Sequence, residues 1–290
     1  MTEDHAHPPR KVEHMRTRII TAVVALAAFI PVLIFSHTWA FPIAMAILSA
    51  IGAVEMLACI GMKKWHLTSL TLIVAAAFPV LARVFGASEN FMPVFVAVFF
   101  CYLIIILALC VFSKGKYDVG EAGISFTMVF YVAASFTSIV LLRDCEIGAY
   151  LYLLAFLGPW MSDSAAYFCG RAFGRHKLIP DVSPKKTVEG SIGGIIFTGI
   201  AFAVYGAFTL VGENGGVLSY VILFIMGALT SGVSQIGDLI ASLIKRKYGI
   251  KDYGKLFPGH GGVMDRFDSV LITSPVLLII AELAVKYSLF

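Results

Sequence analysis

The segment from Phe91 to Phe112 reads FMPVFVAVFFCYLIIILALCVF and contains no charged residue. A helix needs roughly 20 mostly apolar residues to cross the core of a bilayer, so this segment predicts a transmembrane helix. Similar segments occur along the whole chain of 290 residues, of which 59% are hydrophobic and 14% are charged. Soluble domains average roughly 45–50% apolar and about 25% charged residues. The composition therefore excludes a disordered chain, a coiled coil and an ordinary cytosolic enzyme.

Nine apolar segments predict nine transmembrane helices, and the polar segments between them are too short to fold as separate soluble domains. The first apolar segment follows a basic leader, but it is longer than the core of a signal peptide and no cleavage site follows it, so we expect a retained helix. The fold class expected is thus all-α, in a polytopic integral membrane protein. The nine segments cover residues 19–36, 40–60, 67–85, 91–112, 123–142, 147–168, 188–211, 217–244 and 269–289.

Lys and Arg are divided unequally between the two sides that these helices would define. All but three of the 22 Lys and Arg residues lie before the first helix or in loops that follow even-numbered helices, and the exceptions are Arg83, Arg143 and Lys286. Basic loops remain on the cytoplasmic side of a membrane. The sequence therefore predicts a cytoplasmic N-terminus, although the net charge is only +4.

The chain divides by its charged motifs into three parts. We expect a cytoplasmic tail over residues 1–18, the first five transmembrane helices over residues 19–146, and a catalytic region over residues 147–290. The five cysteines occur singly, without a Cys-x-x-Cys pair, so they indicate neither a zinc ribbon nor a disulfide framework. Glu55, inside the second apolar segment, is expected to pair with a Ser, Thr or Lys of the bundle.

The first polar motif of the catalytic region combines a carboxylate with cations. Asp163 lies in or at the end of the sixth apolar segment, and a carboxylate at that depth indicates a functional site. Residues 183–187 read SPKKT and directly precede the seventh segment. Turn amides and helix N-termini bind anions. The motif predicts an anion site, and the alternative is an anchor for anionic lipid head groups.

A polar stripe marks the eighth apolar segment. Its members recur every three or four residues and would share one face of a helix: Ser231, Gln235, Asp238, Ser242 and Lys245. Lipid would leave these groups without hydrogen-bond partners, so the stripe must face protein or a water-filled cavity.

Residues 258–268 read PGHGGVMDRFD and complete the pattern. Asp265 and Asp268 would lie on one face of a helical turn, where a divalent cation or an Arg such as Arg266 would relieve their repulsion. Gly261 and Gly262 would let the backbone approach a ligand closely. Mg²⁺ prefers a few carboxylates together with phosphate oxygens, so the motif predicts a polyphosphate site. The alternative is that the aspartates only pair with nearby Lys and Arg.

The run from Ser242 to Asp268 reads SLIKRKYGIKDYGKLFPGHGGVMDRFD and resembles the signature of phosphatidate cytidylyltransferases, also called CDP-diacylglycerol synthases. The blocks at residues 163–167 and 183–190 resemble that family as well, whereas residues 1–150 agree only in being multi-helical. The resemblance implies that CTP and phosphatidic acid react to give CDP-diacylglycerol and pyrophosphate. It also implies a homodimer in the lipid bilayer, with no nucleic-acid partner. In a bacterium the location would be the cell (inner) membrane, with the active site facing the cytoplasm.

Roles for the site residues are hypotheses that follow from this resemblance. Mg²⁺ would be held by Asp238 and Asp265, while Asp268 would complete or support a second cation site. The side chains expected to hold the phosphates of CTP are Lys245, Arg246, Lys251 and Arg266. The phosphatidate head group or the triphosphate tail would contact Ser183, Lys185, Lys186 and Thr187. The remaining substrate-binding candidates are Asp163, Ser242, His260, Gly261 and Gly262.

Two other classes of protein share some of these features. An ion- or proton-coupled transporter would also have many membrane spans and buried aspartates. Transport carboxylates lie near the bilayer midplane, whereas Asp265 and Asp268 follow a basic, Gly-rich segment. A phospho-alcohol transferase of the CDP-alcohol type carries an Asp-Gly-x-x-Ala-Arg pattern, and this pattern is absent from the sequence.

Overall fold

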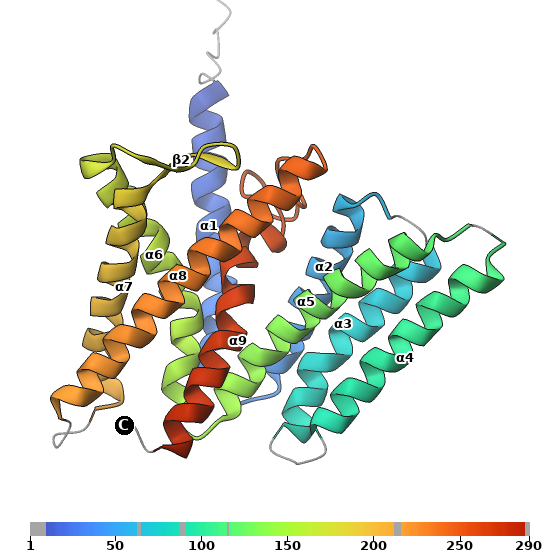
Figure 1. The fold of residues 1–290 in the computed structure, drawn as a ribbon, viewed down its shortest axis with the longest axis horizontal. Coiled ribbons are helices and arrows are strands. Elements are labelled where there is room, and N and C mark those ends of the chain that lie inside the picture. The colour runs from blue at the N-terminus through green and yellow to red at the C-terminus, as the bar shows by residue number, and fades with distance from the viewer. Residues whose placement is uncertain (1–9, 63–64, 87–90, 115, 212–215, 288–290) are drawn as a thin grey trace, which may run out of the picture.

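The computed structural model of the chain describes residues 10–62, 65–86, 91–114, 116–211 and 216–287. In these ranges the chain forms nine α-helices and one two-stranded sheet (Figure 1). The elements are α1 (Arg10–Ile34), α2 (Ala40–Cys59), α3 (Trp65–Phe85), α4 (Phe91–Phe112), α5 (Val119–Asp144), α6 (Gly148–Phe173), β1 (Lys177–Ile179), β2 (Ser183–Thr187), α7 (Val188–Thr209), α8 (Val217–Lys247) and α9 (Met264–Lys286).

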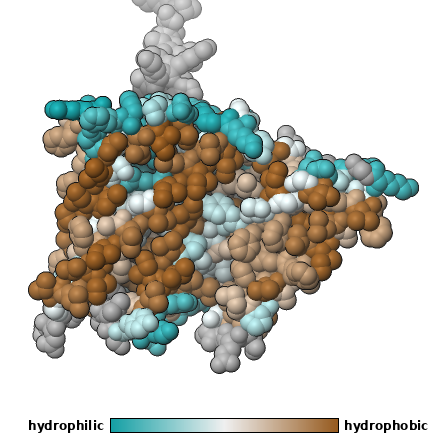
Figure 2. Space-filling view, in the orientation of Figure 1, coloured by the Kyte–Doolittle hydropathy of each residue, from teal (hydrophilic) through white to brown (hydrophobic). Residues whose placement is uncertain are grey.

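The expected all-α membrane fold is confirmed. Among the described residues, seven helices are long and apolar enough to cross a bilayer, namely α2–α5 and α7–α9. The apolar part of α1, Arg18–Ile34, is shorter, and α6 is not among the seven. The total of nine spans therefore stays a prediction. Figure 2 shows a wide hydrophobic face on the bundle with a hydrophilic band at one end, as a bilayer environment requires.

Helix packing divides the bundle into two groups joined by α9. Helices α2, α3 and α5 pack closely together, α4 lies against α3 and α5, and α7 packs between α6 and α8. Helix α9 contacts α5, α6 and α8, so it connects the two groups (Figure 1). The buried core between them contains Phe136 and Phe156. This arrangement brings the polar positions of α6, α8 and α9 together.

Several boundaries differ from the sequence-based expectation because local capping and charged turns extend the helices. Helix α5 begins at Val119, since Asp118 and Glu121 form a capping box at its N-terminus. Helix α9 begins at Met264, so Asp265 and Asp268 belong to its first turns. Residues 1–9 of the expected tail lie outside the described residues, as do Lys63 and Lys64, and the chain is already helical from Arg10.

A β-hairpin between α6 and α7 was not expected from the sequence. Strands β1 and β2 pair antiparallel, with Lys177 opposite Thr187 and Ile179 opposite Ser183. Pro184 interrupts any helix at this point because it lacks a backbone N–H group. Thr187 then caps α7, since its side chain accepts a hydrogen bond from the Gly190 N–H at 3.2 Å. The hairpin lies at the end of the bundle where α1 begins (Figure 1).

Candidate active site

The polar stripe of α8 faces protein, as the sequence predicted. Ser231 is fully buried, and its hydroxyl lies 2.7 Å from the hydroxyl of Ser162 on α6. Gln235 accepts a hydrogen bond from the Ser191 hydroxyl of α7 at 2.5 Å and donates one to the Ser191 carbonyl at 3.2 Å. These bonds satisfy the buried polar groups and hold α6, α7 and α8 in register below the site.

Three carboxylates from three different helices meet above this polar layer. Asp163 of α6, Asp238 of α8 and Asp268 of α9 lie close enough for their charges to repel one another. Lys186 of strand β2 forms an ion pair with Asp238. Arg266 also lies close enough to Asp163 to attract its charge. The unexpected hairpin thus supplies a cation to a carboxylate cluster, and α9 supplies another.

Asp265 has a different environment from the other aspartates. Its side chain is 3% exposed and lies 3.0 Å from the ammonium group of Lys245. Its second oxygen accepts hydrogen bonds from the backbone N–H groups of Tyr253, at 2.7 Å, and Gly262, at 3.0 Å. Asp265, in the first turn of α9, therefore holds the connection between α8 and α9 through Tyr253 and Gly262 and binds the end of α8 through Lys245.

The connection between α8 and α9 forms a tight turn around His260. The Phe257 N–H donates to the Gly261 carbonyl at 2.8 Å, and the His260 N–H donates to the Phe257 carbonyl at 2.8 Å. Gly259 and Gly261 have φ angles of +76° and +87°, which side chains other than that of glycine rarely adopt. A Cβ atom on Gly261 would lie 2.5 Å from an oxygen of Asp265. Glycine is required here for both conformation and space.

Glu55 of α2 holds the other side of this connection, and the expectation of a Ser, Thr or Lys partner was wrong. Its two carboxylate oxygens accept hydrogen bonds from the backbone N–H groups of Val263, at 3.1 Å, and Met264, at 2.9 Å. N–H groups at the start of a helix have no partner within the helix, and a negative charge is favourable there. A residue 208 positions away in the chain thus caps the helix that carries Asp265 and Asp268.

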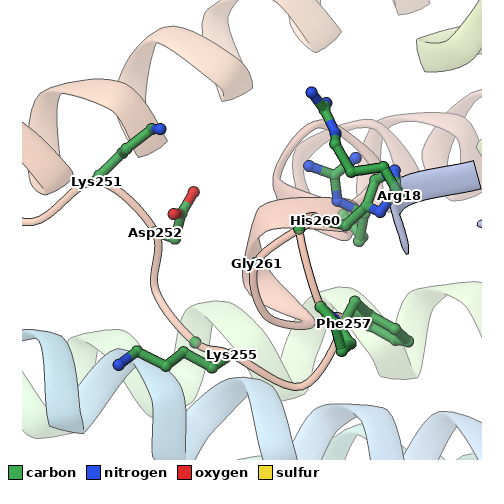
Figure 3. A pocket seen from close by; sticks show the side chains of 11 residues that line it. Arg18, Lys251, Asp252, Lys255, Phe257, His260 and Gly261 are labelled. Carbon is green, nitrogen blue, oxygen red and sulfur yellow. The ribbon is translucent and has the colours of Figure 1, made fainter. Parts of the chain in front are cut away.

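A basic recess, which we call the polar recess, opens beside the turn and has a volume of about 710 Å³ (Figure 3). Figure 3 shows Lys251, Asp252 and Lys255 on one wall and Arg18 with His260 on the other. The side chains that define the polar recess are Arg18, Lys251, Asp252, Lys255, His260 and Arg266. Arg18 comes from α1, and its place in this site was not predicted, because in the sequence it is only the last cation of the basic leader before an apolar segment.

A second cavity, which we call the apolar cleft, has a volume of about 510 Å³ and runs between α1, α2, α6 and α9. Its apolar walls include Ala22, Ala25, Phe29, Ile47, Leu48 and Trp160. Asp163, Asp265 and Asp268 also line it. Phe257, His260 and Arg266 line both the polar recess and the apolar cleft. The two cavities therefore meet where the cations and carboxylates gather.

The surroundings shift the pKa of two titratable groups in the connection between α8 and α9. The pKa of His260 is lowered, first because burial disfavours the charged imidazolium and then because Arg266 and Arg18 lie nearby. Burial also raises the pKa of Tyr253, whose hydroxyl donates to the Ala241 carbonyl at 2.9 Å. Both groups are therefore neutral at pH 7, and His260 can donate one hydrogen bond without adding charge to the polar recess.

Some predicted site residues lie apart from both cavities. Lys185 and Arg246 are exposed on β2 and α8, and Ser183 and Ser242 are half-buried on the same elements. The Thr187 hydroxyl is used as the cap of α7. By contrast, the structure brings together the larger set that consists of Asp163, Lys186, Asp238, Lys245, Lys251, His260, Gly261, Gly262, Asp265, Arg266 and Asp268.

The donors present fit a hard divalent cation in their chemistry. Within the described ranges, no three His, Cys, Asp or Glu side chains form a ready cage for a metal ion. Mg²⁺ does not require such a cage, because it uses one or two protein carboxylates together with waters and phosphate oxygens. The mutual repulsion of Asp163, Asp238 and Asp268 also favours a cation between them. Magnesium at this site stays a prediction.

A basic recess that adjoins an apolar cleft in a membrane protein has the polarity to accommodate a polyphosphate beside a lipid. Comparison with known proteins agrees. The family model described as "Cytidylyltransferase family" matches residues 16–284. A phosphatidate cytidylyltransferase of Staphylococcus haemolyticus is 34% identical over 267 residues, covering 92% of this chain and 98% of that protein. One of Bacillus subtilis is 32% identical over 275 residues, covering 93% and 98%.

The chain belongs to the cytidylyltransferase family. It is a membrane nucleotidyltransferase of phospholipid synthesis, and its bacterial relatives imply location in a cell membrane. The transporter alternative therefore gives way to an enzyme.

Proposed function

We propose that this chain transfers the cytidylyl group of CTP to phosphatidate and so forms CDP-diacylglycerol and pyrophosphate. One observation carries the proposal: the polar recess and the apolar cleft share Phe257, His260 and Arg266. A nucleoside triphosphate has the charge that suits the polar recess, and acyl chains have the polarity that suits the apolar cleft. The two reacting phosphates would then meet at the shared boundary.

The chemistry needs little proton transfer. An oxygen of the phosphatidate phosphate attacks the α-phosphorus of CTP, the new P–O bond forms, and the bond to the β-phosphate breaks to release pyrophosphate. A phosphomonoester has a second pKa of about 6, so the nucleophile is already an anion near neutral pH. The catalytic problem is to hold two anions in line and to stabilise the departing charge.

Cations of the site address that problem. Arg266 lies at the boundary of both cavities, where it would contact the reacting phosphates. Lys251 on the wall of the polar recess would hold the triphosphate tail. Lys245 is already paired with Asp265, so its role in this proposal is to hold the connection between α8 and α9 in place.

The carboxylate cluster is proposed as the magnesium site. Asp238 and Asp268, with Asp163 beside them, would hold Mg²⁺, and the ion when bound would neutralise negative charge on phosphate oxygens. Asp265, which the sequence predicted as a magnesium ligand together with Asp238, has both oxygens engaged by Lys245 and two backbone N–H groups. We therefore assign Asp265 to positioning, and a second cation remains a proposal to be tested by ion titration.

Placement in the membrane and assembly are also proposals. The connection between α8 and α9, which lines the polar recess, lies at the end of the bundle where α1 begins (Figure 1). The unequal distribution of Lys and Arg supports a cytoplasmic position for that end. Reporter enzymes fused to the C-terminus test the orientation, because a cytoplasmic C-terminus would contradict it. A homodimer rests on the family resemblance, and the mass of the purified protein after subtraction of bound detergent tests it.

The function is tested with the purified full chain in detergent micelles that contain phosphatidate. Radiolabelled CTP is expected to yield a labelled lipid that co-migrates with CDP-diacylglycerol, EDTA is expected to abolish this product, and added Mg²⁺ to restore it. Asp268→Asn should lose activity, whereas the matched control Asp181→Asn, exposed in the hairpin turn, should keep it. Absence of labelled lipid from the unaltered chain would refute the proposal.

A further inference from the structure

Arg18 occupies the point on α1 where the polar recess and the apolar cleft come together. It is the first residue of the apolar part of α1, Arg18–Ile34. Arg18 lines the polar recess, and Thr21 and Ala22, about one helical turn further along, line the apolar cleft. One helix thus presents a cation to the first cavity and an apolar wall to the second.

The side chain of Arg18 packs directly on the turn that carries His260. A Cβ atom on Gly259 would lie 2.6 Å from Cγ of Arg18, so only glycine leaves room for the arginine stem. Arg18 also lies close enough to His260 to disfavour its protonation. Figure 3 places Arg18 and His260 on the same wall of the polar recess. The position of Arg18 is therefore set by packing against the turn between α8 and α9 that contains Gly259 and His260.

The charge of Arg18 has no protein partner among the described residues. No salt bridge joins it to an acidic side chain there, and the same holds for Lys251, Lys255 and Arg266 around the polar recess. Asp252 is the acidic residue that lines the polar recess. A cluster of cations with so little compensation attracts anions, and the planar guanidinium fork of arginine matches phosphate oxygens in pairs.

We propose that Arg18 binds the phosphomonoester of the lipid substrate, while α1 forms the wall along which an acyl chain lies. The proposal rests on the proposed function and adds a ligand for one of its two substrates. Lys251 and Lys255 lie on the opposite wall of the polar recess (Figure 3), where they would serve the nucleotide. Arg18 is closer to the apolar cleft through Thr21 and Ala22, so it would serve the lipid.

The test separates the two sources of phosphate by kinetics. The full chain and its variants are assayed in neutral mixed micelles, first with phosphatidate varied at saturating CTP and then with CTP varied at saturating phosphatidate. Arg18→Gln should raise the KM for phosphatidate roughly 10- to 100-fold, as expected for loss of one charged hydrogen-bonding group, with the KM for CTP changed less than about twofold. Arg18→Lys keeps the charge but loses the fork, and should lie between.

Two comparison variants fix the interpretation. Lys255→Gln, on the opposite wall, should raise the KM for CTP and leave that for phosphatidate unchanged. Lys286→Gln, at the far end of α9, should change neither constant. Arg18→Gln raising the KM for CTP alone, or neither constant, would overturn the proposal, provided that the unfolding midpoint of the variant is within a few degrees of the unaltered chain.

A binding measurement without CTP makes the proposal independent of catalysis. Native mass spectrometry compares retention of phosphatidate and of phosphatidylglycerol by the unaltered chain, Arg18→Gln and Arg18→Lys. Selective loss of phosphatidate from Arg18→Gln is expected, with partial retention by Arg18→Lys. Equal loss of both lipids would show a general membrane anchor and overturn the proposal. If the unaltered chain retained phosphatidate but made no CDP-lipid, the proposed function would fail while the assignment of Arg18 stood.

Discussion

Replacement of Glu55 tests whether the first half of the chain positions the site. In the unaltered chain the N–H groups of Val263 and Met264 donate to the two oxygens of the Glu55 carboxylate, at 3.1 and 2.9 Å. Glu55→Gln keeps only one oxygen acceptor for these two N–H groups. The variant loses one of the two bonds and the negative charge that favours the start of α9. A hydrogen bond to a charged group contributes about 1.5–3 kcal/mol, and an unpaired buried N–H group costs a similar amount.

The magnitude follows from these two bonds. If the loss falls on the arrangement of Asp265 and Arg266 in the reacting complex, 1.5–3 kcal/mol corresponds to roughly a 10- to 150-fold fall in kcat/KM. Glu55→Ala removes both bonds, so its effect should be about twice as large in free energy. Part of the loss should also lower the unfolding midpoint, because Glu55 joins α2 to α9.

The assay measures formation of labelled CDP-lipid and the unfolding midpoint for Glu55→Gln and Glu55→Ala. Glu146→Gln is the matched control, because Glu146 is exposed in the loop between α5 and α6, and it should behave like the unaltered chain. Unchanged kcat/KM and an unchanged midpoint in Glu55→Gln would refute the reasoning, since the carboxylate would then contribute nothing to the start of α9.

Three further predictions concern the connection between α8 and α9. Lys245→Met leaves the buried Asp265 carboxylate without its cation and should lower stability by about 3–5 kcal/mol. The double variant Lys245→Met with Asp265→Asn should recover part of that loss. A double variant as unstable as Lys245→Met alone would argue against the ion pair between Lys245 and Asp265. His260 has a pKa below its ordinary value, so the folded chain binds this proton less readily than the unfolded chain, and stability should fall as the pH drops below about 6.5. The unfolding midpoint between pH 7.5 and 5.5 should fall more in the unaltered chain than in His260→Gln, and equal slopes would contradict the assignment. Gly261→Ala should lose at least about 1–2 kcal/mol of stability, because Gly261 has a φ angle of +87° and a Cβ atom there would meet Asp265. Gly232→Ala in α8 should be neutral or gain up to about 1 kcal/mol, because a Cβ atom there meets nothing within 4 Å. Similar unfolding midpoints for the two variants would count against a strained turn at Gly261.

Much of the site could be predicted from local pattern. The stripe from Ser231 to Lys245 follows helical spacing, and such a stripe in an apolar helix must face protein, as Ser231 and Gln235 do. The glycines at 259 and 261 lie in the positive-φ positions that a tight turn requires. The hairpin was not predicted because its two strands are short and mostly polar, so they lack the alternating pattern of a half-buried strand. Their pairing depends on the ends of α6 and α7 being close.

The roles of individual aspartates could not be predicted, because spacing alone does not show which oxygens are engaged. Asp265 and Asp268 are three residues apart on one helix, and the sequence predicted a cation-binding role for both. In the structure Asp265 is held by Lys245 and two backbone N–H groups, whereas Asp268 belongs to the carboxylate cluster with Asp163 and Asp238. Their different environments arise from segments that are distant in the chain.

The sequence by itself determined the membrane environment, the helical fold and the kind of reaction, because hydrophobic length and the signature at residues 242–268 are local properties. Only the tertiary structure decided that Glu55 caps α9 and that Arg18 enters the polar recess. Both residues lie in the first half of the chain, where local sequence shows only a basic leader that ends at Arg18 and a single acidic residue, Glu55, inside an apolar run. Their partners lie more than 200 positions away in the chain, and packing of α1, α2 and α9 around one site brings them together.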